Sequence, residues 1–320
     1  MVWNGDESIR PNNTALCTID TCPVSDSVYG YAPKLAPNLV LLVLFSLSTF
    51  GFIFVGIWKK TWGFFIAMGL GGLRTYSIVK SPYKLEVVGY IGRVGGSSDP
   101  FNGLGGQSFM IQICCLTVAP ACYAAGIYLC LARIVMAFGE DISRIKPRWY
   151  TYIFVTCDLI SLITQSVGGA IASTSNDSAG SKLGGDITLG GLAFQVFTMT
   201  FFMALCGEFA LRCWNRRQMF DEKQRGLRES KRFKYFLYAM GAATIFIYVR
   251  CVYRVAELSK GWNGPLMTTE TYFIVLEGSM VILACLCLNI FHPGICFEAS
   301  YASRSNSSKE DSVSMDELTS

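Results

Sequence analysis

The run FMIQICCLTVAPACYAAGIYLCL, residues 109–131, contains no charged side chain. A helix of this length rises about 35 Å, because each residue adds about 1.5 Å, and the hydrocarbon core of a bilayer is about 30 Å thick. The run is apolar on all sides, whereas an amphipathic helix of a soluble bundle keeps a polar face. It therefore predicts a helix that crosses a membrane.

Five further runs share this length and composition: 38–57, 150–173, 187–211, 235–254 and 272–291. The whole chain of 320 residues is 52% hydrophobic and only 16% charged, whereas ordinary soluble domains carry about 25% charged residues. We therefore predict an all-α, multi-pass membrane protein. The stretch 1–36 has no apolar segment behind a basic start, so we expect the first helix to serve as the targeting signal.

A second helix is interrupted in the sequence. Residues 62–73, WGFFIAMGLGGL, rise about 18 Å and cannot span alone, but with residues 86–95, EVVGYIGRVG, they would form one full span. Between them lies RTYSIVKSPYKL, residues 74–85, with three cations and a proline that would be costly in mid-bilayer. Two interpretations stay open: translated intron or misplaced splice site, or a re-entrant loop.

Several ordered runs carry a family resemblance: CTIDTCPVSDSVYGYAP, EVVGYIGR, LTVAPACYAAGIYLCLARI, PRWYTYIFVTCDLISLITQSVGG, GGLAFQ, YVRCVYRVAE and LNIFHPG. Over about residues 17–295 the chain resembles the fungal RTA-like lipid-translocating exporters, whose relatives include aminocholesterol-resistance proteins and sphingoid-base exporters. The resemblance implies seven transmembrane helices. Two departures stand out, because the family's second helix is uninterrupted and its seventh carries an Asp and a Pro-Met pair where this chain reads LEGSM, residues 276–280.

The distribution of Lys and Arg between the helices predicts the orientation in the membrane. One set of connections carries two, four and nine of them, and the alternate set carries none or one. The cation-rich connections are 58–61, 133–148 and 212–234, and the cation-poor ones are 97–106, 174–185 and 258–269. We therefore expect the N-terminus outside and the C-terminus in the cytoplasm.

This orientation divides the chain into an outer segment 1–36, a membrane domain 37–293 and a Ser-rich, disordered cytoplasmic tail 294–320. The glycosylation acceptors Asn12 and Asn176 fall on the outer side, whereas Asn306 lies in the tail and is expected to stay unmodified. Cys17 and Cys22 lie in the outer segment, where an oxidising compartment permits a disulfide between them.

Ionisable residues inside membrane helices are rare and indicate function by default. We expect Arg250, Arg254 and Glu257, at i, i+4 and i+7, to form one stripe near the outer end of their helix. Together with glutamates of the seventh helix, this stripe places arginines and glutamates in the outer third of the bundle. A cavity lined in this way would suit a zwitterionic or amino-alcohol head group. The alternative is a structural salt-bridge network. The candidate residues are Glu86, Arg93, Asp158, Gln165, Arg250, Arg254, Glu257 and Glu277.

Known catalytic and energy-coupling motifs are missing from the sequence. It has no G-x-x-x-x-G-K-[ST] phosphate loop and only one histidine, His292. We expect no enzyme activity, cofactor, metal site or nucleic-acid partner. The resemblance implies translocation or export of a membrane lipid, such as a sphingoid base, or of another amphiphilic toxic compound at the plasma membrane, conferring resistance. The alternatives are a seven-helix receptor or sensor of lipid asymmetry, and an energy-independent scramblase.

Overall fold

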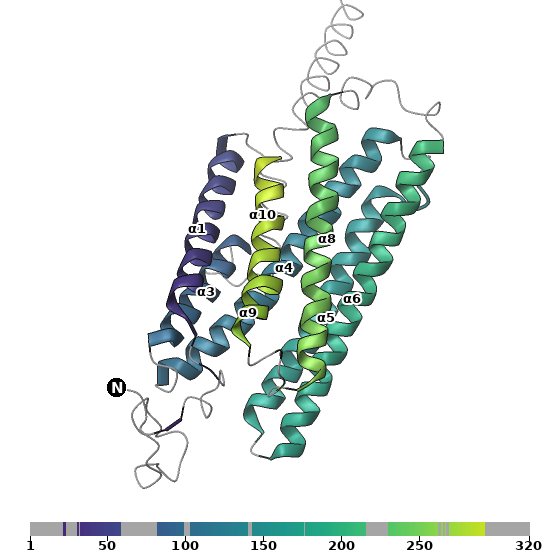
Figure 1. The fold of residues 1–320 in the computed structure, drawn as a ribbon. Helices are drawn as coiled ribbons and strands as arrows, with labels where there is room; N and C mark the ends of the chain where they lie inside the picture. The colour runs from purple at the N-terminus through teal and green to yellow at the C-terminus, as the bar shows by residue number, and fades with distance from the viewer. Residues whose placement is uncertain are drawn as a thin grey trace, which may run out of the picture.

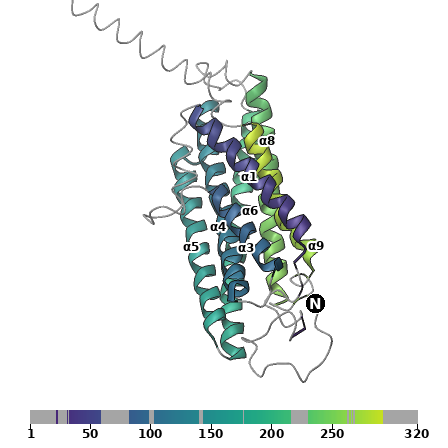
Figure 2. The same ribbon diagram turned by 90° about the vertical axis from the view of Figure 1, so that its left-hand side faces the viewer.

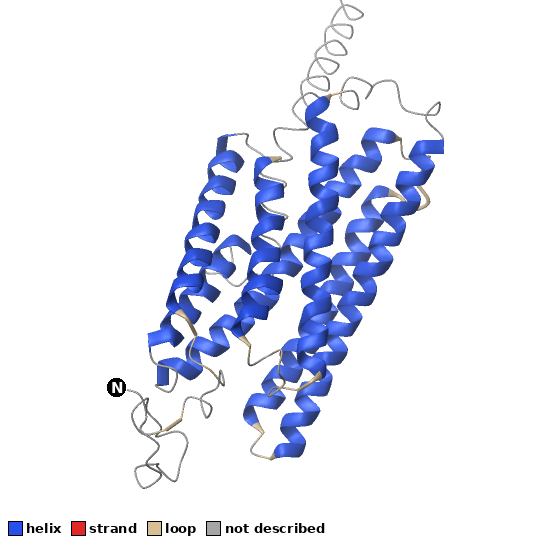
Figure 3. Ribbon diagram, in the orientation of Figure 1, coloured by secondary structure: helices blue, strands red, loops and turns tan. Residues whose placement is uncertain are grey.

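The computed structural model describes residues 22–23, 31, 33–58, 82–98, 103–139, 143–175, 177–215, 230–261, 264, 266 and 269–291. Every regular element in these ranges is a helix (Figure 3). The helices lie roughly side by side in an elongated bundle, with α1 at one edge in the view of Figure 1 and α6 at the other. The predicted all-α architecture is therefore confirmed for the described part of the chain.

The elements follow the predicted apolar runs along the chain. Their bounds are α1 Leu35–Trp58, α3 Pro82–Ser98, α4 Gly103–Phe138, α5 Pro147–Thr174, α6 Ser178–Asn215, α8 Lys231–Ser259, α9 Glu270–Tyr272, η7 Phe273–Ser279 and α10 Met280–Ile290. The last three form one continuous helical segment. Six described helices are long and apolar enough to cross a bilayer, counting that segment as one. The chain is an integral membrane protein.

Helix α3 is the described part of the predicted interrupted span. Its 17 residues rise about 26 Å, slightly less than the hydrocarbon thickness. It begins at Pro82, which suits the first helical position because that residue's missing N–H has no partner to lose. The last four residues of the predicted insert, 82–85, are thus the first turn of α3. Residues 59–81 lie outside the described ranges, so a seventh span stays a prediction.

The predicted outer connection 174–185 is wrong in its extent. Helix α5 ends at Thr174 and α6 already begins at Ser178, although the first turns of α6 are rich in glycine. Glycine there allows close backbone approach: a Cβ on Gly184 would lie 2.4 Å from the backbone nitrogen of Ala172. Small residues let membrane helices pack this closely. Packing against α5 therefore extends α6 through residues that the sequence favours as a loop.

The final span is not a uniform α-helix. Between α9 and α10 the segment η7 is π-helical, which means that a backbone N–H bonds to the carbonyl five positions earlier rather than four. The hydroxyl of Ser279 donates to the carbonyl of Ile274, five positions earlier, at 3.0 Å. Such segments are uncommon and occur frequently at functional sites. Glu277 lies within this π-helical segment, and Glu270 lies in α9 just before it.

Helix α4 is the most central of the spanning helices. Within the apolar part of α4, 61% of the residues are buried, compared with 28% in α1 and in α5. Helix α3 packs against both α1 and α4 (Figure 2). On α4, Tyr128 packs its ring against Phe154 of α5 and Phe202 of α6 at centroid distances of 5.4 and 4.6 Å. This aromatic contact joins the α5–α6 pair to the rest.

Candidate functional site

Charged side chains from three helices meet inside the bundle. Helix α3 carries Glu86 and Arg93, α8 carries the stripe that begins at Arg250, and the α9–η7 segment carries Glu270 and Glu277. Residues three, four and seven apart lie on one face of a helix, so each set faces the same way. Of the seven charged members, six are 9% exposed or less, and Arg254 is 14% exposed. They form two clusters.

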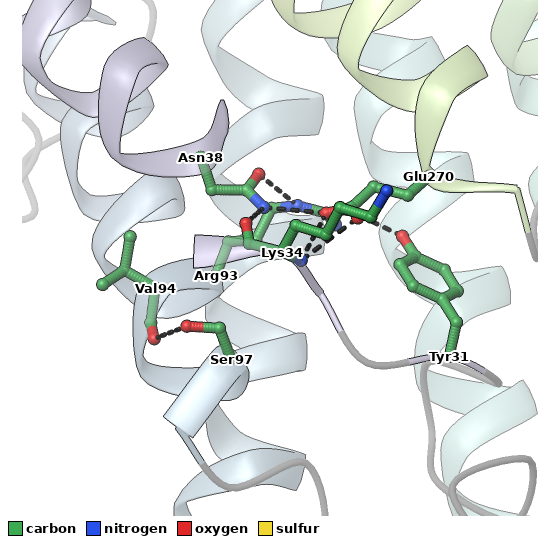
Figure 4. A network of polar contacts seen from close by, with 7 residues as sticks. All are labelled: Tyr31, Lys34, Asn38, Arg93, Val94, Ser97 and Glu270. Carbon is green, nitrogen blue, oxygen red and sulfur yellow. Dashed lines mark hydrogen bonds and ion pairs between the residues drawn. The ribbon is translucent and has the colours of Figure 1, made fainter. Parts of the chain in front are cut away.

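The first, the Arg93 cluster, lies where α1 begins and consists of Tyr31, Lys34, Asn38, Arg93 and Glu270 (Figure 4). Arg93 donates from Nε to Asn38 Oδ1 at 2.7 Å and from Nη2 to Tyr31 Oη at 2.7 Å, and its Nη2 lies 3.5 Å from Glu270 Oε1. The guanidinium also lies 3.9 Å from the ring centroid of Phe273, a cation–π distance. Every face of Arg93 is therefore occupied.

Glu270 also caps helix α1 from a distant part of the chain. The backbone N–H of Lys34 donates to both of its oxygens, at 2.9 and 3.1 Å, and Asn38 Nδ2 donates to Oε1 at 2.9 Å. The first N–H groups of a helix have no partner within it, and a negative charge there is favourable.

Burial raises the pKa of the Tyr31 phenol above its usual value, and Arg93 offsets this only in part. Tyr31 is thus a neutral hydroxyl at physiological pH.

The second, the Arg250 cluster, consists of Arg250, Tyr253, Arg254, Glu257 and Glu277. Glu277 accepts a hydrogen bond from Arg250 Nη2 at 2.9 Å through Oε1, and its Oε2 lies 3.6 Å from Arg254 Nη1. Arg254 also pairs with Glu257, which accepts from Tyr253 Oη at 3.1 Å. Two arginines of α8 therefore hold one carboxylate of η7 between them.

The Arg250 cluster also reaches the central helix. Arg250 Nη2 donates to the backbone carbonyl of Leu116 on α4 at 2.6 Å. The side chain of Leu116 lies against Gly89 of α3, where an added Cβ would be 2.8 Å from it. This contact brings α3, α4 and α8 to the same level of the bundle.

Glu86 and Tyr90 lie one turn apart on the same face of α3. Glu86 is 2% exposed and forms no ion pair with a described residue. Tyr90 is fully buried and its ring stacks on Phe45 at 5.2 Å, while its Oη would lie 2.5 Å from a Cβ added at Gly278 of η7. Within the described residues, Glu86 Oε1 and Tyr90 Oη have no hydrogen-bond partner.

The RTA1-like protein family matches residues 83–300, which is more than half of the sequence. The chain belongs to this family. The resemblance seen in the sequence is confirmed.

Relatives of this RTA1-like protein come from Saccharomyces cerevisiae. The sphingoid long-chain base transporter RSB1 of strain Lalvin EC1118 is 33% identical over 319 residues, which covers 90% of this chain and 80% of the relative. The protein RTA1 of strain S288c is 26% identical and covers 83% of this chain and 84% of the relative. The protoporphyrin uptake protein 1 is 28% identical over 64% of each chain. No solved structure matches.

Two of the predicted polar residues of this RTA1-like protein lie in a different cluster. Asp158 Oδ2 accepts from Tyr128 Oη at 3.0 Å, and Gln165 Nε2 donates to Ser161 Oγ at 2.7 Å and to Gln195 Oε1 at 3.1 Å. These contacts join α4, α5 and α6 without an ion pair among the described residues. Asp158 and Gln165 therefore lie outside the two arginine clusters, and their part in the site stays a prediction.

Other predicted features of the RTA1-like protein fall on undescribed residues. Cys22 is fully buried and disulfide-bonded, but Cys17 lies outside the described ranges, so their pairing stays a prediction. The acceptors Asn12 and Asn176 lie outside them as well, and so do residues 74–81 of the insert. No group of three or more metal-ligating side chains occurs in the part of the chain that the structure describes.

Seven contributors to the site were not among the candidates from sequence: Tyr31, Lys34, Asn38, Tyr90, Tyr253, Glu270 and Phe273. Asn38 had a usable signal, because an amide in the first turn of an apolar helix is unusual. Tyr90 could have been found from its spacing, four residues after Glu86 and three before Arg93. The aromatic side chain of Phe273 and the backbone N–H of Lys34 carry no such signal.

Proposed function

We propose that this RTA1-like protein exports an amphiphilic base of the sphingoid type, or a toxic compound of similar chemistry, and thereby confers resistance to it. The observation that carries the proposal is the set of charges buried between α3, α8 and η7. A charged group inside a membrane is costly and is retained where it binds or moves a polar group. The similarity to a protein named as a sphingoid long-chain base transporter supports this substrate class.

The carboxylates of this region are the groups that would pair with a cationic head group. The two clusters and Glu86 contain four carboxylates, and three guanidinium groups and the ammonium of Lys34 balance them in number. Glu86 is the one of the four carboxylates that forms no ion pair with a described residue, and a protonated amine would supply one. The apolar outer faces of the helices would leave the hydrocarbon tail in lipid, as with Phe50 and Leu47 of α1, which are 71% and 65% exposed.

The proposal is tested by expressing the chain in yeast cells that lack their own sphingoid-base exporter. We expect lower intracellular accumulation of labelled sphingosine, faster appearance in the medium and growth at higher concentrations than in cells with an empty vector. N-acetylsphingosine, which has no cationic amine, is the control substrate. Unchanged efflux and growth, with the protein present at the cell surface, would reject the export function.

We further propose a plasma-membrane location and seven spans. We also propose an outer N-terminus and a cytoplasmic tail, an orientation that the Lys and Arg distribution supports. The segments 1–36, 37–293 and 294–320 are the proposed domains. Asn12 and Asn176 then carry glycan, and Asn306 does not. An endoglycosidase shift in a variant that retains only the Asn306 acceptor would reverse the orientation.

A disulfide between Cys17 and Cys22 and the nature of residues 74–85 belong to the same proposal. Mass spectrometry of the unreduced protein after proteolysis should find the two cysteines in one cross-linked product. Peptide coverage across residues 74–85 in the same sample decides between the two interpretations of the insert. Peptides that join residue 73 directly to residue 86 would support removal of the segment.

A further inference from the structure

Four carboxylates belong to the charged region, and three of them form ion pairs with arginines. Glu270 pairs with Arg93, Glu277 lies between Arg250 and Arg254, and Glu257 pairs with Arg254. Glu86 differs, since it forms no ion pair with a described residue and its Oε1 has no hydrogen-bond partner, although the residue is only 2% exposed. One oxygen of Glu277 also lacks a hydrogen bond, but it lies 3.6 Å from the guanidinium of Arg254. Arg250 directs its hydrogen bonds to Glu277 and to Leu116.

Leaving a carboxylate buried without a partner is unfavourable, because burial removes its hydration and nothing replaces it. A residue kept only for stability would be paired, as Glu270 and Glu277 are. The neighbouring hydroxyl of Tyr90, one turn along the same face of α3, is also buried and unpartnered among the described residues. Two oxygens on one face of α3 are therefore buried without a hydrogen-bond partner.

A donor with several N–H groups and a positive charge would satisfy both oxygens. A primary ammonium has three hydrogen-bond donors and no acceptor, so it supplies the donors that these two oxygens lack. A metal ion is a poorer match, because no arrangement of three or more suitable ligands exists in the described ranges.

Helix α3 has two unlike faces at this position. Helix α3 presents Ile91 and Val88 outward, at 55% and 36% exposed, while Glu86 and Tyr90 face the interior. The outward face of α3 at this level is therefore apolar, which is what the tail of an amphiphile requires.

On these grounds we propose that the carboxylate of Glu86, assisted by the hydroxyl of Tyr90, binds the protonated primary amine of the transported amphiphile. The inference rests on the proposed export function and assigns its amine subsite. Glu277 and Glu270 are then the framework that holds α3, α8 and η7 in place.

The test compares binding of sphingosine and of N-acetylsphingosine to the full-length protein in phosphatidylcholine nanodiscs. We expect the wild type to bind the free amine more tightly than the amide. In Glu86→Gln this preference should disappear through about tenfold or greater loss of sphingosine affinity, the size of one charge-assisted hydrogen bond. Glu86→Asp should retain part of the preference. Asp186→Asn, an exposed carboxylate on α6, is the matched control and should bind as the wild type does.

Thermal unfolding of the same samples separates the amine subsite from a structural role. Glu86→Gln should unfold at or above the wild-type temperature, because a neutral amide replaces an unpaired charge at nearly constant volume. A lower unfolding temperature or failure to fold would overturn the inference. So would an unchanged amine preference, or equal loss of affinity for both ligands. Failure of the wild type to export sphingosine from cells would instead reject the export function itself.

Discussion

The α5–α6 pair and the α3–α8–η7 region hold their helices together by different means. Between α5 and α6 the contacts are neutral, with Ser161 donating to the carbonyl of Gly191 at 2.7 Å and glycine backbones in direct approach. Between α3, α8 and η7 the contacts are ion pairs among buried arginines and glutamates. Neutral close packing suffices for stability, so the charged region indicates a second requirement.

The largest effect is expected where one carboxylate serves two arginines. Glu277→Gln removes the carboxylate that pairs with Arg250 and leaves this buried charge uncompensated, at a cost of ~3–5 kcal/mol. Arg254 keeps its pair with Glu257. We expect surface abundance to fall, and tolerance to sphingosine to fall in proportion. Immunoblotting of surface protein and growth assays on the same cells measure both. Normal abundance with lost tolerance would place Glu277 in the amine subsite and remove the distinction drawn from Glu86.

A smaller effect is expected from overpacking the neutral interface. In Gly184→Ala the new Cβ would meet the backbone of Ala172 at 2.4 Å, and backbone cannot move aside as a flexible side chain can. Overpacking of this kind costs ~1–3 kcal/mol. The unfolding temperature in detergent should fall while the ratio of sphingosine to N-acetylsphingosine binding stays that of the wild type. A changed ratio would mean that the α5–α6 pair takes part in recognition.

A substitution in the Arg93 cluster tests whether a positive charge at position 93 is sufficient for stability. Arg93→Lys keeps the charge but cannot serve Asn38, Tyr31 and Glu270 together or stack on Phe273, because an ammonium lacks the planar fork. We expect a loss of ~1–2 kcal/mol, the size of one or two hydrogen bonds. Thermal unfolding in detergent measures it, with Lys182→Arg on α6 as the exposed control. Wild-type stability would show that only the charge matters there.

The smallest effect should come from a glycine at which an added Cβ would meet open space. A Cβ at Gly190 of α6 would have no heavy atom within 4 Å, in contrast to Gly184 six residues earlier. Gly190→Ala should raise stability by ~0.5–1 kcal/mol through helix propensity alone. A rise in the unfolding temperature supports this explanation. A fall would show that the close contact extends further along α6 than the geometry indicates.

The sequence predicted the six apolar spans and the polar stripes but misjudged one connection. Periodicity places Arg250, Arg254 and Glu257 on one face, since this follows from helix geometry alone. The connection 174–185 failed because its glycines favour a loop locally, whereas the approach of α6 to α5 makes them helical. The cap on α1 could not be predicted, because Glu270 is 236 residues from Lys34 along the chain.

The sequence by itself determined that this chain lies in a membrane, that it is helical, and which of its helices carry charge. These properties depend on composition and on spacing within one helix, which local physics sets. Only the tertiary structure decided which charges are paired, because pairing depends on how α3, α8 and η7 rotate and approach one another. That rotation pairs Glu277 with two arginines and leaves Glu86 without an ion pair in the described structure. From the sequence the two glutamates look alike.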